Sequence, residues 1–281
     1  MLVQVPVMFQ LNQSTLNKLY FLFFSLFFLQ SCNENHENKN LPTHKEWVYD
    51  FNAETLDTNV WNIVKGNGCP QLCGFGNNEL QHYTNSEENL LIKNGQLVIS
   101  ATYDSVFKSA KLTSENYIDF QTGSVEVSAK LPSARGTWPA IWLLPSLERP
   151  LNWPLDGEID IMENVGYNPN YIFGTIHTAA YNHTKGTHLT DSIFIDDLDQ
   201  NFHSYKLVWT DSTLAWFVDD IQFHFLSKTK HDTENEWPFD KPFHLILNLA
   251  VGGDWGGKMG VDTNAFPQDF FIDYIKIKSP S

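Results

Sequence analysis

Glu158, Asp160 and Glu163 lie close together in the segment Asp156-Gly157-Glu158-Ile159-Asp160-Ile161-Met162-Glu163-Asn164. Successive side chains of a strand point to opposite faces, so Glu158 and Asp160 share one face while the isoleucines beside them face the core. Glu163 falls on the core face unless one extra residue, a β-bulge near Met162, shifts the alternation. With that bulge, three carboxylates would line one cleft, an arrangement suited to proton transfer and nucleophilic attack.

A solvated acidic strand edge is the competing interpretation of these three acids. However, apolar residues alternate with the acids, which indicates that the strand is packed on one side. Three like charges there repel one another unless one is protonated or all of them serve a ligand. Upstream, Trp138 and Trp142 are four residues apart and would present both rings on one side of a strand, as a platform would.

The elements that must position these residues are short strands. Apolar and polar residues alternate over 97–101, 124–130, 203–209, 214–218, 244–249 and 271–277. Between such runs lie the turn-forming pairs Asn94-Gly95, Asp219-Asp220 and Gly252-Gly253. No long stretch has a helical apolar period, so residues 46–281 are predicted to form one all-β domain of two packed antiparallel sheets.

Composition narrows the class of partner. The chain has 281 residues, 42% apolar and 18% charged, with a net charge of −15, which excludes a disordered tail, a collagen-like chain and a minimal disulfide-stapled peptide. The negative charge disfavours nucleic acid and sulfated polysaccharides. Nine Trp and ten Tyr provide rings that stack on flat apolar faces, so we expect a neutral partner and no nucleic acid.

The first 45 residues are predicted to be a targeting segment and a tether. Lys18 precedes a short apolar run that ends at Leu29-Gln30-Ser31-Cys32, which resembles a bacterial lipoprotein signal over residues 1–31 with Cys32 as the lipidated residue. Residues 32–45 are polar and are expected to form a tether. This predicts an exported outer-membrane or cell-surface lipoprotein that meets the membrane only through its lipid. The alternative is a plain secretory signal, with a periplasmic or secreted protein.

Cys69 and Cys73 remain once Cys32 is assigned to the lipid. Two cysteines four residues apart, in a loop with Gly and Pro of an exported chain, favour a local disulfide. A zinc site is less favoured, because zinc requires four clustered ligands and only His82 is near in sequence.

The sequence resembles glycoside hydrolase family 16 and, within it, the laminarinase-like β-1,3-glucanases. The hallmark Glu-hydrophobic-Asp-hydrophobic-x-Glu is matched by Glu158, Asp160 and Glu163, with the extra residue that separates bulged members from the plant xyloglucan transglycosylases. The likeness spans about residues 47–278 and continues through Asn77-Asn78-Glu79-Leu80-Gln81, Trp138-Pro139-Ala140-Ile141-Trp142, Gly174-Thr175-Ile176-His177-Thr178, Tyr181-Asn182-His183-Thr184-Lys185-Gly186-Thr187 and Asn248-Leu249-Ala250-Val251-Gly252-Gly253-Asp254-Trp255.

This resemblance implies a β-jelly-roll sandwich with a concave substrate cleft and retaining hydrolysis of a β-1,3-glucan such as laminarin, or of a mixed β-1,3/1,4-glucan. Glu158 would be the nucleophile and Glu163 the general acid, then base. Asp160 would hydrogen-bond Glu158 and help to keep Glu163 protonated. No cofactor is expected for catalysis, and we expect a monomer.

Other matching positions are candidates for binding. Trp138, Trp142, Trp153 and Trp255 are expected to stack on glucosyl rings, since the loop around Trp255 offers it almost no apolar side chain, whereas Trp61, Trp209 and Trp216 are assigned to the core. His177 is expected to act near the catalytic groups as a donor. Polar contacts in the cleft are assigned to Asn78, Glu79 and Asn248.

Two further features follow from the resemblance. Asp50, Gly95 and Asp273 match the oxygen ligands of a structural calcium found in many relatives. The family's Tyr-Gly-Arg is replaced by Thr122-Gly123-Ser124, so an arginine that contacts substrate in relatives is absent, and we consider Arg135 or Lys111 as a substitute.

Two alternatives to a glucanase stay open at this point. The first is a non-catalytic β-glucan-binding protein on the same fold, although such proteins usually lack the glutamates. The second is a same-clan enzyme that cleaves an agar-like or carrageenan-like galactan, which the net charge of −15 disfavours where the galactan is sulfated.

Overall fold

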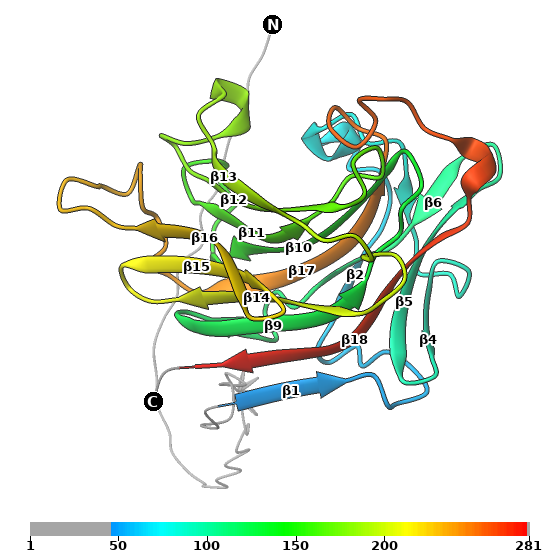
Figure 1. The fold of residues 1–281 in the computed structure, drawn as a ribbon, viewed down its shortest axis with the longest axis horizontal. Coiled ribbons are helices and arrows are strands. Elements are labelled where there is room, and N and C mark those ends of the chain that lie inside the picture. Colours follow the sequence, from blue (N-terminus) through cyan, green and yellow to red (C-terminus); the bar gives the residue numbers. More distant parts are fainter. Residues whose placement is uncertain (1–45, 280–281) are drawn as a thin grey trace, which may run out of the picture. The chain divides into compact units, whose positions relative to one another are not determined.

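The computed structural model describes residues 46–279, and these residues form two β-sheets that pack face to face (Figure 1). The predicted signal over 1–31, the lipidated Cys32 and the tether over 32–45 lie outside the described residues. Among the residues described, no helix has the length and apolar character needed to cross a membrane.

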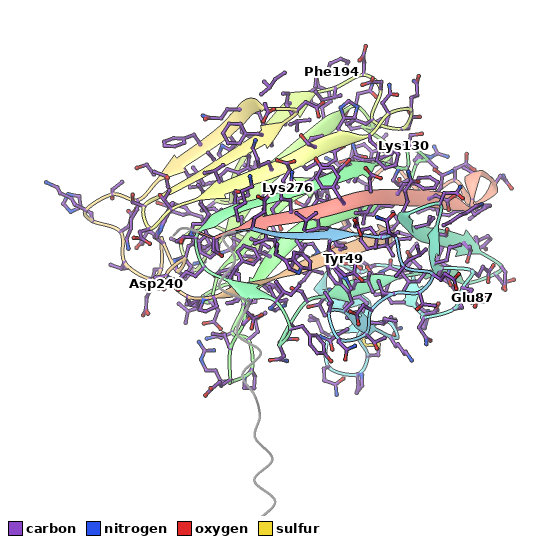
Figure 2. The ribbon with its side chains drawn as sticks, turned by 90° about the horizontal axis from the view of Figure 1, so that it is seen from below. Tyr49, Glu87, Lys130, Phe194, Asp240 and Lys276 are labelled. Carbon is purple, nitrogen blue, oxygen red and sulfur yellow. A yellow bond between two sulfur atoms is a disulfide. The ribbon has the colours of Figure 1, made fainter. Side chains whose placement is uncertain are left out.

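The larger sheet has ten strands in the order β16-β15-β14-β9-β18-β5-β6-β3, with β1 paired to β18 and β4 paired to β5. Its strands are β1 (Glu46–Asp50), β3 (His82–Tyr83), β4 (Leu90–Lys93), β5 (Gln96–Tyr103), β6 (Phe107–Ser109), β9 (Gly123–Lys130), β14 (His203–Trp209), β15 (Thr213–Val218), β16 (Ile221–Ser227) and β18 (Gln268–Lys278). Figure 2 views this sheet, with Lys130 on β9 and Lys276 on β18.

The smaller sheet has eight strands in the order β13-β12-β11-β10-β17-β7-β2, with β8 paired to β17. Its strands are β2 (Asn62–Val64), β7 (Lys111–Thr113), β8 (Asp119–Phe120), β10 (Thr137–Pro145), β11 (Glu158–Glu163), β12 (Tyr171–His177), β13 (Leu189–Phe194) and β17 (Phe243–Val251). The helices of the described residues are three short 3-10 turns, η1 (Cys73–Gly76), η2 (His183–Lys185) and η3 (Thr263–Ala265).

The predicted all-β sandwich is confirmed, and each of the six predicted runs falls within an observed strand. Asp219 and Asp220 have positive φ angles of 48° and 65° and turn the chain between β15 and β16, as expected for a tight hairpin. Gly252 and Gly253 make no hairpin. Instead, Gly252 forms an isolated bridge with Glu79, so this pair starts a loop across the end of the smaller sheet.

The core lies between the sheets and contains the three tryptophans assigned to it. Trp61, Trp209 and Trp216 are each 2% exposed or less. On β11, Ile159 and Ile161 are also buried, so the core face of this strand is the one that the alternation predicted.

The predicted β-bulge is present in β11. Asp160 pairs with Trp142 of β10 and Met162 pairs with Ile141, which leaves Ile161 as the extra residue. The bulge brings Glu163 to the same face as Glu158 and Asp160. The indole N–H of Trp216, on the other sheet, donates to the Asp160 carbonyl at 2.8 Å, so the bulged backbone is tied to the opposite layer.

This tie can be tested with Trp216→Phe. The variant leaves the buried Asp160 carbonyl without that donor, which typically costs about 1–3 kcal/mol beyond the loss of packing. Trp209→Phe is the matched control, because the Trp209 indole is equally buried but its N–H has no acceptor among the described residues. Urea unfolding should show a larger loss of stability for Trp216→Phe, and equal losses would contradict a structural role for this bond.

Candidate active site

The three acids of β11 lie in a cleft with a volume of about 660 Å³ on the face of the smaller sheet that points away from the core. The strand pairing sets residues side by side across this face. Glu163 lies opposite Ala140 of β10, Ala140 lies opposite Asn248 of β17, and Asn248 lies opposite Lys111 of β7. Side chains from four strands therefore meet in one row across the floor of the cleft.

Each glutamate is held by the indole of a tryptophan. Trp153 donates its N–H to Glu158 Oε2 at 2.9 Å, and Trp138 donates its N–H to Glu163 Oε1 at 2.9 Å. An N–H that points at a carboxylate stabilises the ionised form and fixes the orientation of the group. Trp138 and Trp153, both predicted to face the cleft, thus also position its carboxylates.

Asp160 and His177 form the buried part of the site, at 3% and 6% exposed. His177 lies opposite Glu158 in the β11–β12 pair, and its Nε2 is 3.4 Å from Asp160 Oδ2 and 3.8 Å from Glu158 Oε1. Burial lowers the pKa of His177 to about 3, and nearby His183 and His188 act in the same direction. The ring is therefore neutral, and these contacts are not ion pairs.

The electrostatics of the three acids are dominated by burial. Burial raises the pKa of Glu158 to about 7 and that of Glu163 to about 8, although the indole N–H groups of Trp153 and Trp138 oppose the shifts. Burial, together with the charges of the two glutamates, raises the pKa of Asp160 well above its usual range. The three carboxyl groups titrate as one set that retains protons near neutral pH.

One group of metal-ligand type occurs among the described residues. Glu158, Asp160 and His177 each offer one atom within 4.8 Å of the others. Because two of these residues belong to the acid motif and lie on the cleft floor, we assign the group to acid–base chemistry.

Most residues predicted to bind substrate do line the cleft. They are Trp138, Trp142, Trp153, Glu79 and Asn248. The Trp142 indole donates to Asn248 Oδ1 at 2.7 Å, and the amide of Asn248 donates to the Tyr83 hydroxyl at 3.1 Å. Gln81 donates to Glu79 Oε2 at 2.6 Å. These bonds fix one indole ring and two polar groups before substrate arrives.

Asn78 and Trp255 are placed differently from the prediction. Asn78 is exposed and donates to both carboxylate oxygens of Asp254, so it anchors the loop after β17 rather than lining the cleft. The Trp255 ring packs edge-on against Trp138 at 5.5 Å and Phe173 at 5.2 Å. The expectation that it lacks apolar neighbours is wrong, because these rings come from distant strands.

Other residues that line the cleft were missed by sequence reasoning, or were named only as a substitute. Leu72 comes from the loop closed by the Cys69–Cys73 disulfide, Phe75 comes from η1 directly after it, and His183 comes from η2. Lys111 also lines the cleft, whereas Arg135 does not. The disulfide loop was visible in the sequence, but nothing there showed that the loop folds over the cleft.

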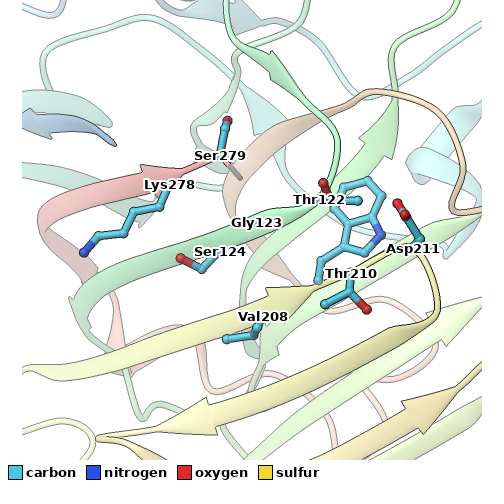
Figure 3. Close-up of a pocket in the computed structure, with 9 residues that line it drawn as sticks. Thr122, Gly123, Ser124, Val208, Thr210, Asp211, Lys278 and Ser279 are labelled. Atoms are coloured by element: carbon cyan, nitrogen blue, oxygen red, sulfur yellow. The ribbon is translucent and has the colours of Figure 1, made fainter. Parts of the chain in front are cut away.

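The Thr122-Gly123-Ser124 segment lies at a separate hollow. It lines a hollow of about 510 Å³ at the end of β9 in the larger sheet, together with the end of β14 and Lys278 (Figure 3). The missing arginine therefore belongs to a segment that lies outside the cleft described above.

The positions matched to a calcium site come from neighbouring elements. Asp50 of β1 pairs with Tyr274 of β18, which directly follows Asp273. Gly95 lies in the turn between β4 and β5, where a Cβ would come within 3.3 Å of the Asn52 side-chain oxygen. Among the described residues, neither Asp50 nor Asp273 is in an ion pair. Carboxylate and carbonyl oxygens from three segments are the kinds of donor that Ca²⁺ prefers.

The raised pKa of Glu163 predicts a pH-dependent stability. Between its unfolded pKa, about 4.5, and its folded pKa, about 8, the folded chain binds more protons than the unfolded chain, so stability falls as pH rises. The glutamine side chain of Glu163→Gln cannot ionise. The free energy of unfolding of this variant should therefore exceed that of the wild type by about 1 kcal/mol or more at pH 8, with little difference at pH 4.

Thermal melts at both pH values measure this difference. Glu234→Gln is the control, because it removes the same charge from an exposed loop. A gain for Glu163→Gln that is equal at both pH values would contradict a buried carboxyl group with a raised pKa.

Comparison with known proteins places this geometry among glycosidases. The sequence profile of Glycosyl hydrolases family 16 matches residues 77–275. A beta-glucanase from Rhodothermus marinus is 40% identical over 256 residues, which cover 87% of this chain and 83% of that protein. A glucan endo-1,3-beta-glucosidase from Cryptopygus antarcticus is 35% identical, covering 83% and 92% of the two chains.

Solved structures agree with the sequence comparison. The crystal structure of a laminarinase from Flavobacterium sp. UMI-01 superposes with a TM-score of 0.78 at 43% identity, covering 83% of this chain and 99% of that one. The sequence motif, the two-sheet fold and the bulged acidic strand therefore agree with one another, and the chain belongs to glycosyl hydrolase family 16.

Proposed function

We propose that this protein hydrolyses internal β-1,3 bonds of neutral β-glucans such as laminarin, with retention of anomeric configuration. The observation that carries the proposal is the bulged strand β11, on which Glu158 and Glu163 face one cleft and each accepts an indole N–H. The names of the relatives, a beta-glucanase, a glucan endo-1,3-beta-glucosidase and a laminarinase, support the same substrate class.

In the proposed first step, an oxygen of ionised Glu158 attacks the anomeric carbon and the glycosidic C–O bond breaks. Glu163 gives its proton to the departing sugar oxygen. In the second step, ionised Glu163 takes a proton from a water molecule, whose oxygen attacks the anomeric carbon and releases Glu158. These steps are the double displacement of retaining glycosidases and need no cofactor.

Asp160 and His177 would prepare Glu158 and Glu163 for these roles. Asp160 lies between the two glutamates in the chain and hydrogen-bonds Glu158, which lowers the pKa of Glu158. The neutral His177 ring packs beside both carboxyl groups, with Nε2 3.4 Å from Asp160 Oδ2 and 3.8 Å from Glu158 Oε1, and neither contact is a hydrogen bond. Asp160 therefore supports the charged form of Glu158, while the charges of Glu158 and Glu79 raise the pKa of Glu163 and favour its protonated form.

The cleft walls support a neutral, flat-faced substrate. Trp138, Trp142 and Trp153 line the cleft and offer indole faces on which the C–H faces of glucosyl rings can stack. Four carboxyl groups also line it, which disfavours a sulfated galactan. Three clustered acids whose pKa values are raised by burial are typical of a catalytic site, which favours an enzyme over a binding protein without activity.

Two substitutions test the proposal. Glu158→Gln and Glu163→Gln should each lower kcat on laminarin by about a thousandfold or more while the fold is kept, because an amide can neither attack nor transfer the proton. Azide should restore cleavage of an activated aryl glycoside by Glu163→Ala, giving a β-glycosyl azide.

Two results would oppose this account. An α-glycosyl azide from Glu163→Ala would show that the nucleophile had been removed and would reverse the two roles. If the wild type released no oligosaccharide from laminarin but did cleave agarose, the proposed substrate would be wrong.

We also propose that Asp50, Asp273 and the Gly95 carbonyl hold a structural calcium that ties the first strand to the last. Binding to the folded state alone should stabilise it by about 2.7 kcal/mol at a hundredfold excess over Kd. Calcium added after chelation should therefore raise the Tm of the wild type by several degrees. Asp273→Asn should remove this response, and a wild type that is indifferent to calcium would contradict the site.

A further inference from the structure

A series of aromatic rings leads from the cleft to the edge of the smaller sheet. It starts at Trp138, which lines the cleft. The Trp255 ring packs on Trp138, with ring centres 5.5 Å apart, and on Phe173 of β12, with ring centres 5.2 Å apart. Farther out, Tyr171 of β12 and Phe194 of β13 pack against each other at 5.5 Å. The last four of these rings are not among the described residues that line the cleft.

The strand register puts the outer rings on the same face as the catalytic acids. Phe173 lies opposite Glu163 in the β11–β12 pair, and opposite residues of antiparallel strands project from the same face. Tyr171 is two residues from Phe173 and therefore shares that face. Phe194 lies opposite Tyr171 in the β12–β13 pair, so it faces the same way. The face that carries Glu163 thus continues without a break to the Tyr171 and Phe194 rings.

Tyr171 and Phe194 are exposed and lie within reach of a chain bound at the acids. Tyr171 is 37% exposed and Phe194 is 55% exposed. β13 is the edge strand of the smaller sheet, and Figure 2 shows Phe194 at the rim of the molecule. From Glu163, Phe194 is two strands across and two residues along, which corresponds to about 10 Å and about 7 Å. A polysaccharide chain is long enough to contact both places at once.

The surface between the acids and the rim is uncharged. On the face shared with the two outer rings, β12 and β13 present Phe173, Thr175, Thr190 and Ser192. The Thr175 hydroxyl donates to the Thr190 hydroxyl at 2.9 Å, which agrees with this alternation. Rings offer faces for the C–H groups of a sugar, and hydroxyl groups beside them can exchange hydrogen bonds with sugar hydroxyls. This surface therefore suits a neutral sugar chain.

We propose that Tyr171 and Phe194 form an outer platform that binds sugar units of the glucan chain beyond those held in the cleft. The inference rests on the proposed substrate class. Continuity with the face of the acids assigns the platform to the glucan rather than to a second copy of the chain. Because the platform lies away from the bond that breaks, its contacts are equal in the ground state and the transition state, so they lower KM and leave kcat unchanged.

Phe194→Ala tests the outer platform. Loss of one stacking ring should raise KM on laminarin about threefold or more and leave kcat unchanged. An activated aryl glycoside of laminaribiose is too short to reach β13, so kcat/KM on this substrate should stay the same. Phe225→Ala is the matched control, because Phe225 is 51% exposed but lies on β16 of the larger sheet. It removes an equally exposed ring and should change neither substrate's kinetics.

Two further variants separate stacking from general apolar contact. Phe194→Tyr keeps a flat ring and should retain the KM of the wild type. Phe194→Leu keeps an apolar side chain without a flat face, so its KM should rise as in Phe194→Ala. If Phe194→Ala does not fold, Phe194→Leu replaces it in the comparison with Phe225→Ala.

Calorimetric titration of the Glu158→Gln chain with laminarin gives a readout that does not depend on cleavage. Adding Phe194→Ala to this chain should weaken laminarin binding about threefold or more. If the wild type failed to cleave laminarin, the proposed function would fall, while this titration would still decide whether the platform binds glucan. An equal rise of KM on both substrates would overturn the inference. Unchanged laminarin binding, with a loss of dimer in size-exclusion chromatography, would assign the rings to a second copy instead.

Discussion

The bulge at Ile161 is the constraint on which the rest of the site depends. In a regular strand Glu163 would point into the core beside Ile161, and β11 would present two acids to the cleft instead of three. The extra residue alters the pairing of β11 with both neighbours, because the register shifts against β10 and against β12. The bond from Trp216 to the Asp160 carbonyl ties this irregular backbone to the larger sheet, so the packing of the two sheets holds the geometry of the cleft.

Burial of the acids makes their chemistry possible and also costs stability. Shielding from water raises the pKa of all three carboxyl groups, which would leave a nucleophile mostly protonated at neutral pH. The chain opposes this with charge-assisted bonds from Trp153 to Glu158 and from Trp138 to Glu163. Trp138 and Trp153 therefore do two things in this cleft, since their rings line it and their N–H groups point at carboxylates.

Local pattern predicted the parts of the molecule that depend on neighbouring residues. Alternation of apolar and polar residues located the strands, and the spacing from Glu158 to Glu163 predicted the bulge. Local pattern failed where contacts come from distant segments. The sequence neighbours of Trp255 are mostly glycines, which suggested that its ring has no apolar contacts. In the structure, however, Trp138 and Phe173 pack against this ring. The Asn78 side chain donates a hydrogen bond to Asp254. Lys111 reaches the cleft floor because β7 pairs with β17. None of these pairings leaves a periodic signal in the sequence.

The stereochemistry of the first product tests the central claim most directly. If Glu158 and Glu163 act as a nucleophile and an acid that face each other across one bond, the reducing end released from laminarin must first appear as the β-anomer. Proton NMR at early time points, before mutarotation, distinguishes the two anomers. The account predicts a β signal that decays slowly towards equilibrium. An α signal that appears first would show a single displacement by water, which requires carboxyl groups about 6.5–9.5 Å apart and would contradict the site proposed for β11.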